Sequence, residues 1–179
     1  MSTEPETGPF DADVLMASLE QFPARLRALV EPLDDDTLHW RSPAAHWSVH
    51  EIVCHLLDEE RRDFRPRLER TLRDPSEPWD PIDPEGWVRA PGYAGWDRPD
   101  TRRQLLQARA ASVAWLRGLA APDWSCAQVH PKLGSMHAGD LLLSWAQHDL
   151  LHIRQVVKRL HERSTAAGTP CEGRYAGSW

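Results

Sequence analysis

Two histidines spaced four residues apart are the first feature of this sequence that can do chemistry. They are His148 and His152, in the segment WAQHDLLHIRQ at residues 145–155, whose composition is typical of a helix. On an α-helix the two imidazoles point the same way, one turn apart, and can bind one metal ion. A chain with 9 histidines in 179 residues gives about 0.4 such pairs by chance. The pair therefore needs a third ligand before it predicts a metal site.

The predicted third ligand is His55. It lies deep within a second predicted helix, on the face that also carries Ile52, Leu56 and Glu59. The remaining histidines lie in predicted loops or near the ends of helices. If the two helices are neighbours, three imidazoles converge on one point. Neutral imidazoles are good ligands for zinc, nickel or ferrous iron, and three of them leave coordination positions open.

Glu59, one turn beyond His55, is the predicted catalytic residue. A carboxylate in that position can orient the ligand ring, complete the coordination or carry a proton. Asp149 is a weaker candidate for this supporting role, because it points about 100° away from His148 around the helix. Cys54 likewise points away from His55 and is left out of the predicted ligand set. Spacing alone leaves open the alternative that all these histidines are partly buried helix residues with ordinary hydrogen bonds.

Four segments have the apolar periodicity of helices. The first and the fourth of them lie nearest the two ends of the chain. The first extends from about residue 11 to 31 and contains Pro23, which can kink or divide it. The fourth extends from about residue 138 to 163 and carries His148 and His152 near its middle. Ligands in the middle of a helix are held away from its frayed ends.

The second helix is predicted over residues 49–73 and has the clearest start signal in the chain. Ser48 and Glu51 have the spacing of a capping box. Two apolar residues around the cap have the spacing of a hydrophobic staple, namely Trp47 and Ile52. Pro66 lies inside the segment and is expected to kink the helix or force a local break.

The third helix is predicted to follow the segment DRPDT. Asp100 or Thr101 is expected to cap it, with Thr101 and Gln104 as a second capping box, and it is expected to end before Pro122. Apolar spacing predicts its buried face, with Leu105 at the edge: Leu106, Ala110, Val113, Leu116 and Ala120.

No segment is a convincing strand, because alternating apolar and polar runs bounded by turns are missing. Four amphipathic helices of about 20 residues predict an all-α protein with a four-helix bundle. Residues 1–163 are expected to form one domain, with residues 1–10 as a loose N-terminal arm. Residues 164–179 are expected to form a C-terminal tail.

Residues 74–99 form a long predicted loop that is rich in proline, glycine and tryptophan. Trp79, Trp87 and Trp96 are expected to be at least partly buried, because aromatic side chains need surface to pack against. We expect the loop to be an ordered cover, with some of these rings lining the approach to the metal. The alternative, that it merely caps exposed core, remains open. Trp179 is also expected to dock onto the bundle.

Composition excludes several classes of partner. The net charge of −6 argues against nucleic-acid binding, which needs a basic surface. No apolar run approaches the roughly 18 residues of a membrane span, and the polar, acidic start MSTEPETGPF resembles neither a signal peptide nor a transit peptide. Three widely spaced cysteines form no disulfide framework, which favours the cytoplasm.

The segments LHWRSPAAHWSVHEIVCHLLDEER and HPKLGSMHAGDLLLSWAQHDLLHIRQVVKRL combine several short motifs. A Trp-Arg-x-Pro turn precedes a Trp-Ser-x-x-Glu helix start and a histidine, and a His-Pro-x-x-Gly-x-Met turn precedes His-x-x-x-His and Arg-Gln. Their residues are Trp40, Arg41, Pro43, Trp47, Ser48, Glu51, His55, His130, Pro131, Gly134, Met136, His148, His152, Arg154 and Gln155. Over roughly residues 11–163, this combination resembles the DinB-like superfamily, which includes YfiT-type proteins described as metal-dependent hydrolases.

The resemblance implies a four-helix bundle whose metal site consists of His55, His148 and His152. The metal in such proteins is often zinc or nickel, with iron as a further option, and the protein is frequently a homodimer. One departure is His137, where many members carry threonine as the N-cap of the last helix. It affects the expected cap and leaves the histidine triad unchanged.

Together these features predict a metal-dependent enzyme that acts on a small-molecule substrate. It is expected to be either a hydrolase or a transferase that uses a low-molecular-weight thiol as co-substrate, since an open metal site can activate water or a thiol. Two other classes of function remain open. One is a non-catalytic module that binds a metal or a small molecule, and the other is a structural dimer whose site is a relic.

Overall fold

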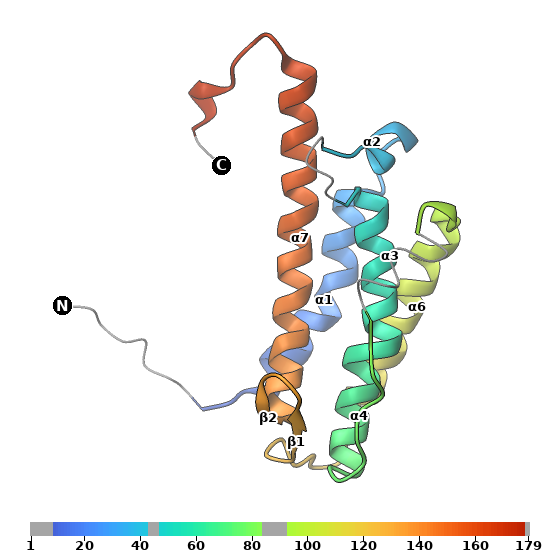
Figure 1. Cartoon of the computed structure of the whole chain (residues 1–179), viewed down its shortest axis with the longest axis vertical. Coiled ribbons are helices and arrows are strands. Elements are labelled where there is room, and N and C mark those ends of the chain that lie inside the picture. The colour runs from blue at the N-terminus through green and yellow to red at the C-terminus, as the bar shows by residue number, and fades with distance from the viewer. Residues whose placement is uncertain (1–8, 43–46, 84–92, 178–179) are drawn as a thin grey trace, which may run out of the picture.

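The chain forms a four-helix bundle in a computed structural model that describes residues 9–42, 47–83 and 93–177 (Figure 1). Four long helical rods lie side by side, as the sequence predicts. The second rod is composite, because a π-helical segment, η1, joins its two α-helices. The bounds are α1 (Ala12–Val30), α3 (Val49–Glu59), η1 (Glu60–Phe64), α4 (Arg65–Arg73), α6 (Arg98–Arg117) and α7 (Ala138–Gly168).

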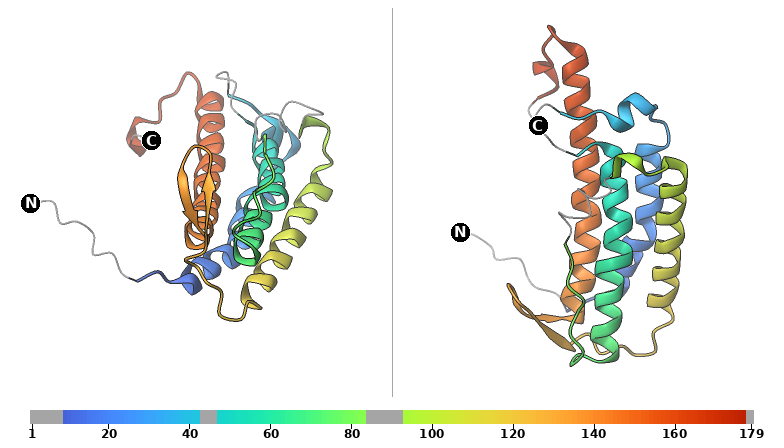
Figure 2. Two further views of the ribbon diagram at one scale, coloured as in Figure 1. Left: turned by 60° about the horizontal axis from the view of Figure 1, so that its bottom comes forward. Right: turned by 45° about the vertical axis from the view of Figure 1, so that its right-hand side comes forward.

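The direction of the rods explains the long loop between the second and third predicted helices. Helices α1 and α7 run one way along the bundle, and the α3–α4 rod and α6 both run the other way (Figures 1 and 2). Because α4 and α6 are parallel, the chain between them must return along the whole length of the bundle. The described tryptophans of this connection, Trp79 and Trp96, are partly buried, as predicted. Trp87 lies outside the described residues, as does Trp179 in the tail.

Each rod packs mainly against two neighbours. Helix α7 packs most extensively on α1, and α3 packs most extensively on α6, while the α3–α7 seam is a smaller contact. In α1 the predicted apolar stripe is confirmed, with Leu19, Phe22 and Leu26 buried, and Pro23 lies within a continuous helix. Helix α7 extends to Gly168, beyond the predicted end near residue 163.

The start of α3 confirms the predicted capping box. The Ser48 hydroxyl accepts a hydrogen bond from the Glu51 N–H, and the Glu51 carboxylate accepts one from the Ser48 N–H at 2.9 Å. The local break expected at Pro66 is also present. Proline has no N–H to donate to the preceding turn, and the helix is π-helical over Glu60–Phe64, immediately before α4.

Helix α6 differs from its prediction in cap and buried face. Its N-cap is Asp97, which accepts from the Asp100 N–H at 3.0 Å, so neither Asp100 nor Thr101 is the cap, and it ends at Arg117. The predicted buried face is only partly right: Leu116 is buried as predicted, but Ala110 and Ala120 are exposed. The residues that are buried on α6 are Thr101, Leu105, Arg109, Ser112 and Leu116. The error arises because three of them are polar.

The prediction that the chain has no strand is also wrong. Strands β1 (Ala127–His130) and β2 (Gly134–His137) pair antiparallel at the end of the bundle where α7 begins (Figure 2). The His130 ring accepts hydrogen bonds from the N–H groups of Lys132 and Leu133, and Gly134 adopts a left-handed φ of 79°. These contacts give the His-Pro-x-x-Gly motif a structural role as the hairpin turn. Each strand is too short to show an alternating pattern.

The remaining elements are short. A five-residue helix, α2 (Asp35–His39), was not predicted in the connection before α3, and it is capped by Asp34. Two 3₁₀ turns complete the described chain, η3 (Tyr93–Gly95) and η4 (Arg174–Ala176). Within the described residues, no helix combines the length and the apolar composition that crossing a membrane requires.

Candidate metal centre

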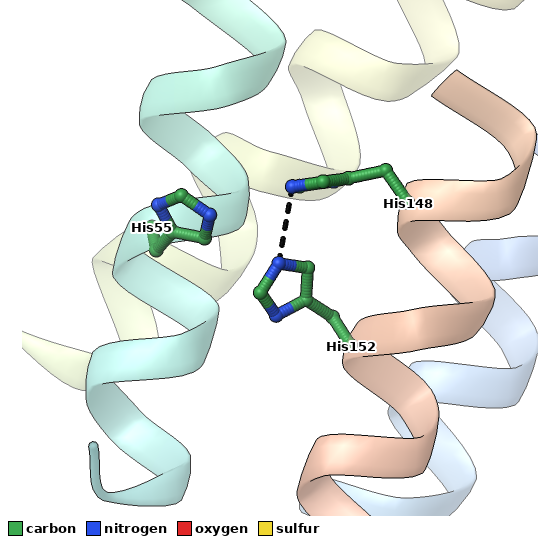
Figure 3. Close-up of side chains that lie close together, drawn as sticks. All are labelled: His55, His148 and His152. Atoms are coloured by element: carbon green, nitrogen blue, oxygen red, sulfur yellow. Dashed lines mark hydrogen bonds between the residues drawn. The ribbon is translucent and has the colours of Figure 1, made fainter. Parts of the chain in front are cut away.

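His55, His148 and His152 face one another across the seam between α3 and α7 (Figure 3). One ring nitrogen of each lies within 4.8 Å of the others. The Nε2 atoms of His148 and His152 are 3.0 Å apart, and the ring centre of His55 lies 5.4 and 4.8 Å from theirs. The structure therefore brings together the three histidines that were singled out in the sequence.

Local structure on both helices brings the three imidazoles together. On α7 the four-residue spacing stacks His148 above His152 on the face turned to α3. On α3 the capping box fixes where the helix begins, and Arg41 strengthens it with a 2.5 Å contact from Nη2 to Glu51 Oε1. The cap fixes the first residue of the helix, and the packing of Ile52 and Leu56 in the core turns the side that carries His55 inward.

Burial keeps the three imidazoles neutral. His55 is 6% exposed, and its pKa is lowered to about 3 by burial and by the charge of His152. Burial lowers the pKa of His148 to about 2, with His152 and His55 adding to the effect. The pKa of His152 is also lowered, mainly by burial. Neutral rings keep a lone pair on one nitrogen, which is the form that binds a metal.

Gln155 orients one of the rings. Its Oε1 accepts a hydrogen bond from His152 Nδ1 at 2.7 Å. Because Nδ1 carries the proton in this bond, the lone pair of His152 lies on Nε2, the atom that faces His148. The sequence pattern contained Gln155 without assigning it a role, although its three-residue spacing from His152 places it on the same side of the helix.

Glu59 lies beside His55, as expected, but makes no hydrogen bond to it. Its Oε1 is 3.7 Å from His55 Nδ1, and that nitrogen is buried without a hydrogen-bond partner among the described residues. Burial, followed by the charge of Asp63, raises the pKa of Glu59 to about 8. Because burial also keeps His55 neutral, the contact between the two side chains is not an ion pair.

These residues fit a divalent ion. A tetrahedral ion with nitrogen ligands at about 2.0–2.1 Å separates those nitrogens by about 3.3 Å. Separations in the cluster, from 3.0 Å for the closest pair to 4.8 Å at most, bracket this value. Three neutral nitrogen donors suit zinc, nickel or ferrous iron, and His55 Nδ1 is a buried polar atom that lacks a protein partner.

Aromatic rings form the walls of the site. Trp47 lies 4.7 Å from the His55 ring and stacks on His152 at 6.5 Å with an interplanar angle of 9°, and Phe64 lies 4.9 Å from His148. These are the non-histidine rings that contact the cluster within the described part of the chain. The described tryptophans of the loop pack elsewhere, Trp79 near His130 and Trp96 near Tyr93.

Two neighbours of the triad point away from it, as the sequence indicates. Asp149 points toward the centre of the bundle, where it forms an ion pair with Arg109. The Cys54 sulfur lies 3.6 Å from a ring nitrogen of His50, and burial raises the pKa of this thiol to about 12. Neither side chain belongs to the cluster of candidate ligands.

The family model described as the DinB superfamily matches residues 18–156. The chain belongs to the DinB superfamily. A solved structure of YfiT from Bacillus subtilis matches with a TM-score of 0.78 and 20% sequence identity, over 92% of this chain and 94% of that chain. YfiT is described as a probable metal-dependent hydrolase with an unusual four-helix bundle topology.

At this level of identity the likeness to YfiT establishes the fold of this DinB superfamily member, which confirms the predicted bundle. A comparison with curated proteins finds no match. The chemistry of the site must therefore be argued from its own residues.

Proposed function

We propose that this protein is a metal-dependent hydrolase in which His55, His148 and His152 bind one divalent ion, with zinc, nickel and ferrous iron as candidates. The observation that carries the proposal is the convergence of three neutral imidazoles from two helices, one of them buried and two partly buried. The shared fold with YfiT supports the same class of reaction. A divalent ion with open coordination positions lowers the pKa of water or of a thiol, so that either becomes a nucleophile at neutral pH.

Glu59 is the proposed proton carrier. Its carboxyl lies beside His55, and its pKa is raised to about 8 by burial and by Asp63. A general acid or base is most effective when its pKa lies near the working pH. The charge of a bound ion would lower this pKa again, so that the carboxyl could give a proton to a leaving group and take one back from water during each turnover. Asp63, which is hydrogen-bonded to Glu59, also forms an ion pair with Arg67 Nε at 2.8 Å.

Trp47 and Phe64 are proposed to exclude bulk water and to hold the apolar part of a small-molecule substrate. Both rings contact imidazoles of the cluster, so a substrate carbonyl that reaches the histidines must lie against them. Displacement of water from such a surface strengthens the electrostatic interactions within the site.

Two other functions use the same residues. In a thiol S-transferase, a low-molecular-weight thiol would replace water as the nucleophile. In a non-catalytic module, the three histidines would bind a metal whose remaining positions are closed. Glu59 favours either enzyme over the binding module, because a carboxyl beside the site is suited to proton transfer and has no function in simple metal storage.

The test compares metal content and turnover in four preparations. These are the protein loaded with zinc, nickel or iron, the chelated protein, and the variants His148→Ala and His161→Ala. Each is assayed with ester and amide substrates, and with thiols paired with an electrophile. His161→Ala is a matched control, because His161 is an exposed histidine of the same helix outside the cluster.

We expect about one metal per chain and ester or amide hydrolysis in the loaded protein and in His161→Ala. Chelation and His148→Ala should each abolish the bound metal and the hydrolysis. Full turnover in the chelated protein or in His148→Ala would rule out the metal mechanism. Thiol-dependent turnover alone would replace the hydrolase by the transferase, and tight metal binding without any turnover would replace it by the binding module.

A further inference from the structure

A buried polar cluster lies where all four rods of the bundle meet, and Arg109 of α6 is at its centre. Arg109 is 2% exposed. Its Nε donates to Glu60 Oε2 at 2.9 Å, its Nη2 donates to Asp149 Oδ1 at 3.0 Å, and its Nη1 reaches the Leu19 carbonyl at 3.4 Å. The Trp145 indole N–H donates to the same Glu60 oxygen at 3.2 Å. One guanidinium thus contacts α1, η1 and α7 from α6.

Stability alone does not account for this cluster. Removing charges from water is costly, and a well-packed apolar group of similar volume often stabilises a core as well as a buried ion pair does. Glu60 Oε1 is also buried without a hydrogen-bond partner among the described residues, so the cluster is incompletely satisfied. What a planar, forked guanidinium provides is direction, because its paired N–H groups fix both the distance and the rotation of a carboxylate.

The carboxylate that Arg109 fixes is next to a candidate ligand. Both guanidinium Nη atoms bind Asp149, which directly follows His148 in α7. Trp145, one turn before His148, is tied to Glu60 and stacks on Phe64 at 5.9 Å with an interplanar angle of 6°. Phe64 in turn contacts the His148 ring at 4.9 Å. The turn of α7 that carries His148 is therefore held on both sides.

The two helices that carry the histidines each have a second large packing partner outside the seam. Helix α3 supplies His55 and packs mainly on α6, while α7 supplies His148 and His152 and packs mainly on α1. Across the seam itself, α7 touches α3, η1 and α4 in turn, and Arg109 adds polar contacts from α6 to both sides of that seam. Arg109 is the residue of α6 that binds both the rod continuing from α3, through Glu60, and α7, through Asp149.

We propose that Arg109 is a positioning residue for the histidine site: through Glu60 and Asp149 it fixes the height and rotation of α7, so that His148 and His152 face His55. This inference rests on the proposed metal binding of those histidines. It assigns a role in the metal site to α6, which contributes no ligand. It also explains why a charged residue, Arg109, occupies the buried face of α6.

The test uses Co²⁺ as the probe, because its visible absorption reports the geometry of the ligands. The main variant, Arg109→Met with Glu60→Gln and Asp149→Asn, removes all three charges together, so that none is left unpaired in the core. Arg109→Lys is the second variant, since it keeps the charge but cannot form the two-pronged contact. The control is Arg159→Met, which removes another buried arginine, one whose partner Glu162 also lies on α7.

We expect the wild-type protein to bind one Co²⁺ with a defined spectrum. The triple variant should remain helical, with its Co²⁺ absorption shifted and its affinity reduced about 10- to 100-fold, and Arg109→Lys should fall between the two. Arg159→Met should keep the wild-type spectrum and affinity even if it unfolds at a lower temperature. Wild-type spectra and affinities in both Arg109 variants would overturn the positioning role and leave the metal site intact. No Co²⁺ binding by the wild-type protein would overturn the proposed function and this inference together.

Discussion

At the scale of single residues, the state of the site depends on which nitrogen of each imidazole carries the proton. For His152 this is decided by Gln155, whose side-chain oxygen accepts from Nδ1 at 2.7 Å. Without that acceptor, His152 can rotate or place its proton on Nε2, the nitrogen that faces the other rings. A residue that never touches the metal can thus determine whether a lone pair is available.

We therefore predict that Gln155→Leu weakens metal binding by about 10- to 100-fold, which is typical when a hydrogen-bond partner of a ligand is removed. The measurement is a competition titration against a chelating dye. Gln155→Glu, which keeps an acceptor oxygen, should retain most of the affinity. Gln147→Leu alters an exposed glutamine of the same helix outside the cluster and should have no effect. An unchanged affinity in Gln155→Leu would show that the ring is held by its packing instead.

Asp58 gives a prediction about pH that does not involve the histidines. Its carboxylate is buried, accepts a hydrogen bond from the Tyr93 hydroxyl at 2.9 Å and lies 3.3 Å from Arg62 Nε. Burial raises the pKa of Asp58, and the hydrogen bond from Tyr93 and the charge of Arg62 offset part of that rise. A raised pKa in the folded state favours the protonated acid. This contribution to stability is complete below the unfolded pKa of about 3.9 and is lost as the pH rises through the folded value.

Asp58→Asn should remove that contribution, because the amide cannot ionise while its oxygen can still accept from Tyr93. We expect the free energy of unfolding of the variant, relative to the wild type, to increase as the pH rises from about 4 to about 7. The measurement is urea unfolding of both proteins at several pH values. At each pH the free energy of the wild type is subtracted from that of the variant, so that the contributions of the other titrating groups cancel. A difference that stays constant over this range would contradict the raised pKa.

At the scale of elements, sequence motifs predicted the structure best where all residues of the motif lie within a few positions of one another. The capping box at Ser48 and Glu51 placed the start of α3 correctly, and with it the face that carries His55. The four-residue spacing of His148 and His152 was enough to place both on one face of α7. Chemistry that depends on short spacings within regular helices can be read directly from such a sequence.

Prediction failed where long-range contacts override periodicity. Apolar spacing on α6 indicated Leu106 and Ala110, but Ala110 is exposed and Arg109 is buried against carboxylates from two other rods. No pattern within α6 identifies those partners, which lie far away in the chain. The roles of Trp47 and Phe64 as walls of the site were missed for the same reason.

The β-hairpin gives a prediction at this scale, since its turn requires a residue with positive φ. Gly134 has φ of 79°, and a Cβ added there would meet nothing within 4 Å. Gly134→Ala should therefore lower the free energy of unfolding by about 1–2 kcal/mol through backbone strain alone. Gly168→Ala, at the end of α7, is the control: it also has open space but no positive φ, and it should not lower stability. The measurement is urea unfolding, and an equal effect of the two variants would contradict the argument.

At the scale of the whole molecule, helix α7 has two sides with different surroundings. The α3–α7 seam carries the histidine cluster, and the opposite side of α7 carries exposed apolar residues. On that side, Leu143 and Leu150 are 40% and 48% exposed. Leu143 and Leu150 are seven residues apart, so they lie on one stripe of the helix. Exposed leucines grouped along one helix are typical of a surface that packs against another protein.

We predict that this stripe of α7 is the contact between two copies of the chain, in keeping with the homodimer that the sequence resemblance implies. A two-fold contact places the same stripe of each copy against the other, so a single charge introduced at its centre appears twice in the interface. Leu150→Glu should therefore convert a dimer into a monomer. Because the histidines face the opposite side of the helix, the monomer should still bind one metal per chain.

The measurement is size-exclusion chromatography with light scattering at micromolar concentration, followed by metal analysis of each peak. Val129→Glu is the matched control, because Val129 is an exposed apolar residue, 81% accessible, that lies on the β-hairpin and away from the stripe. It should leave the dimer intact. A monomeric wild-type protein, or a Leu150→Glu variant that remains dimeric, would contradict the predicted interface. Loss of metal from a folded Leu150→Glu monomer would show instead that the histidine site depends on the second copy, although its candidate ligands all come from one chain.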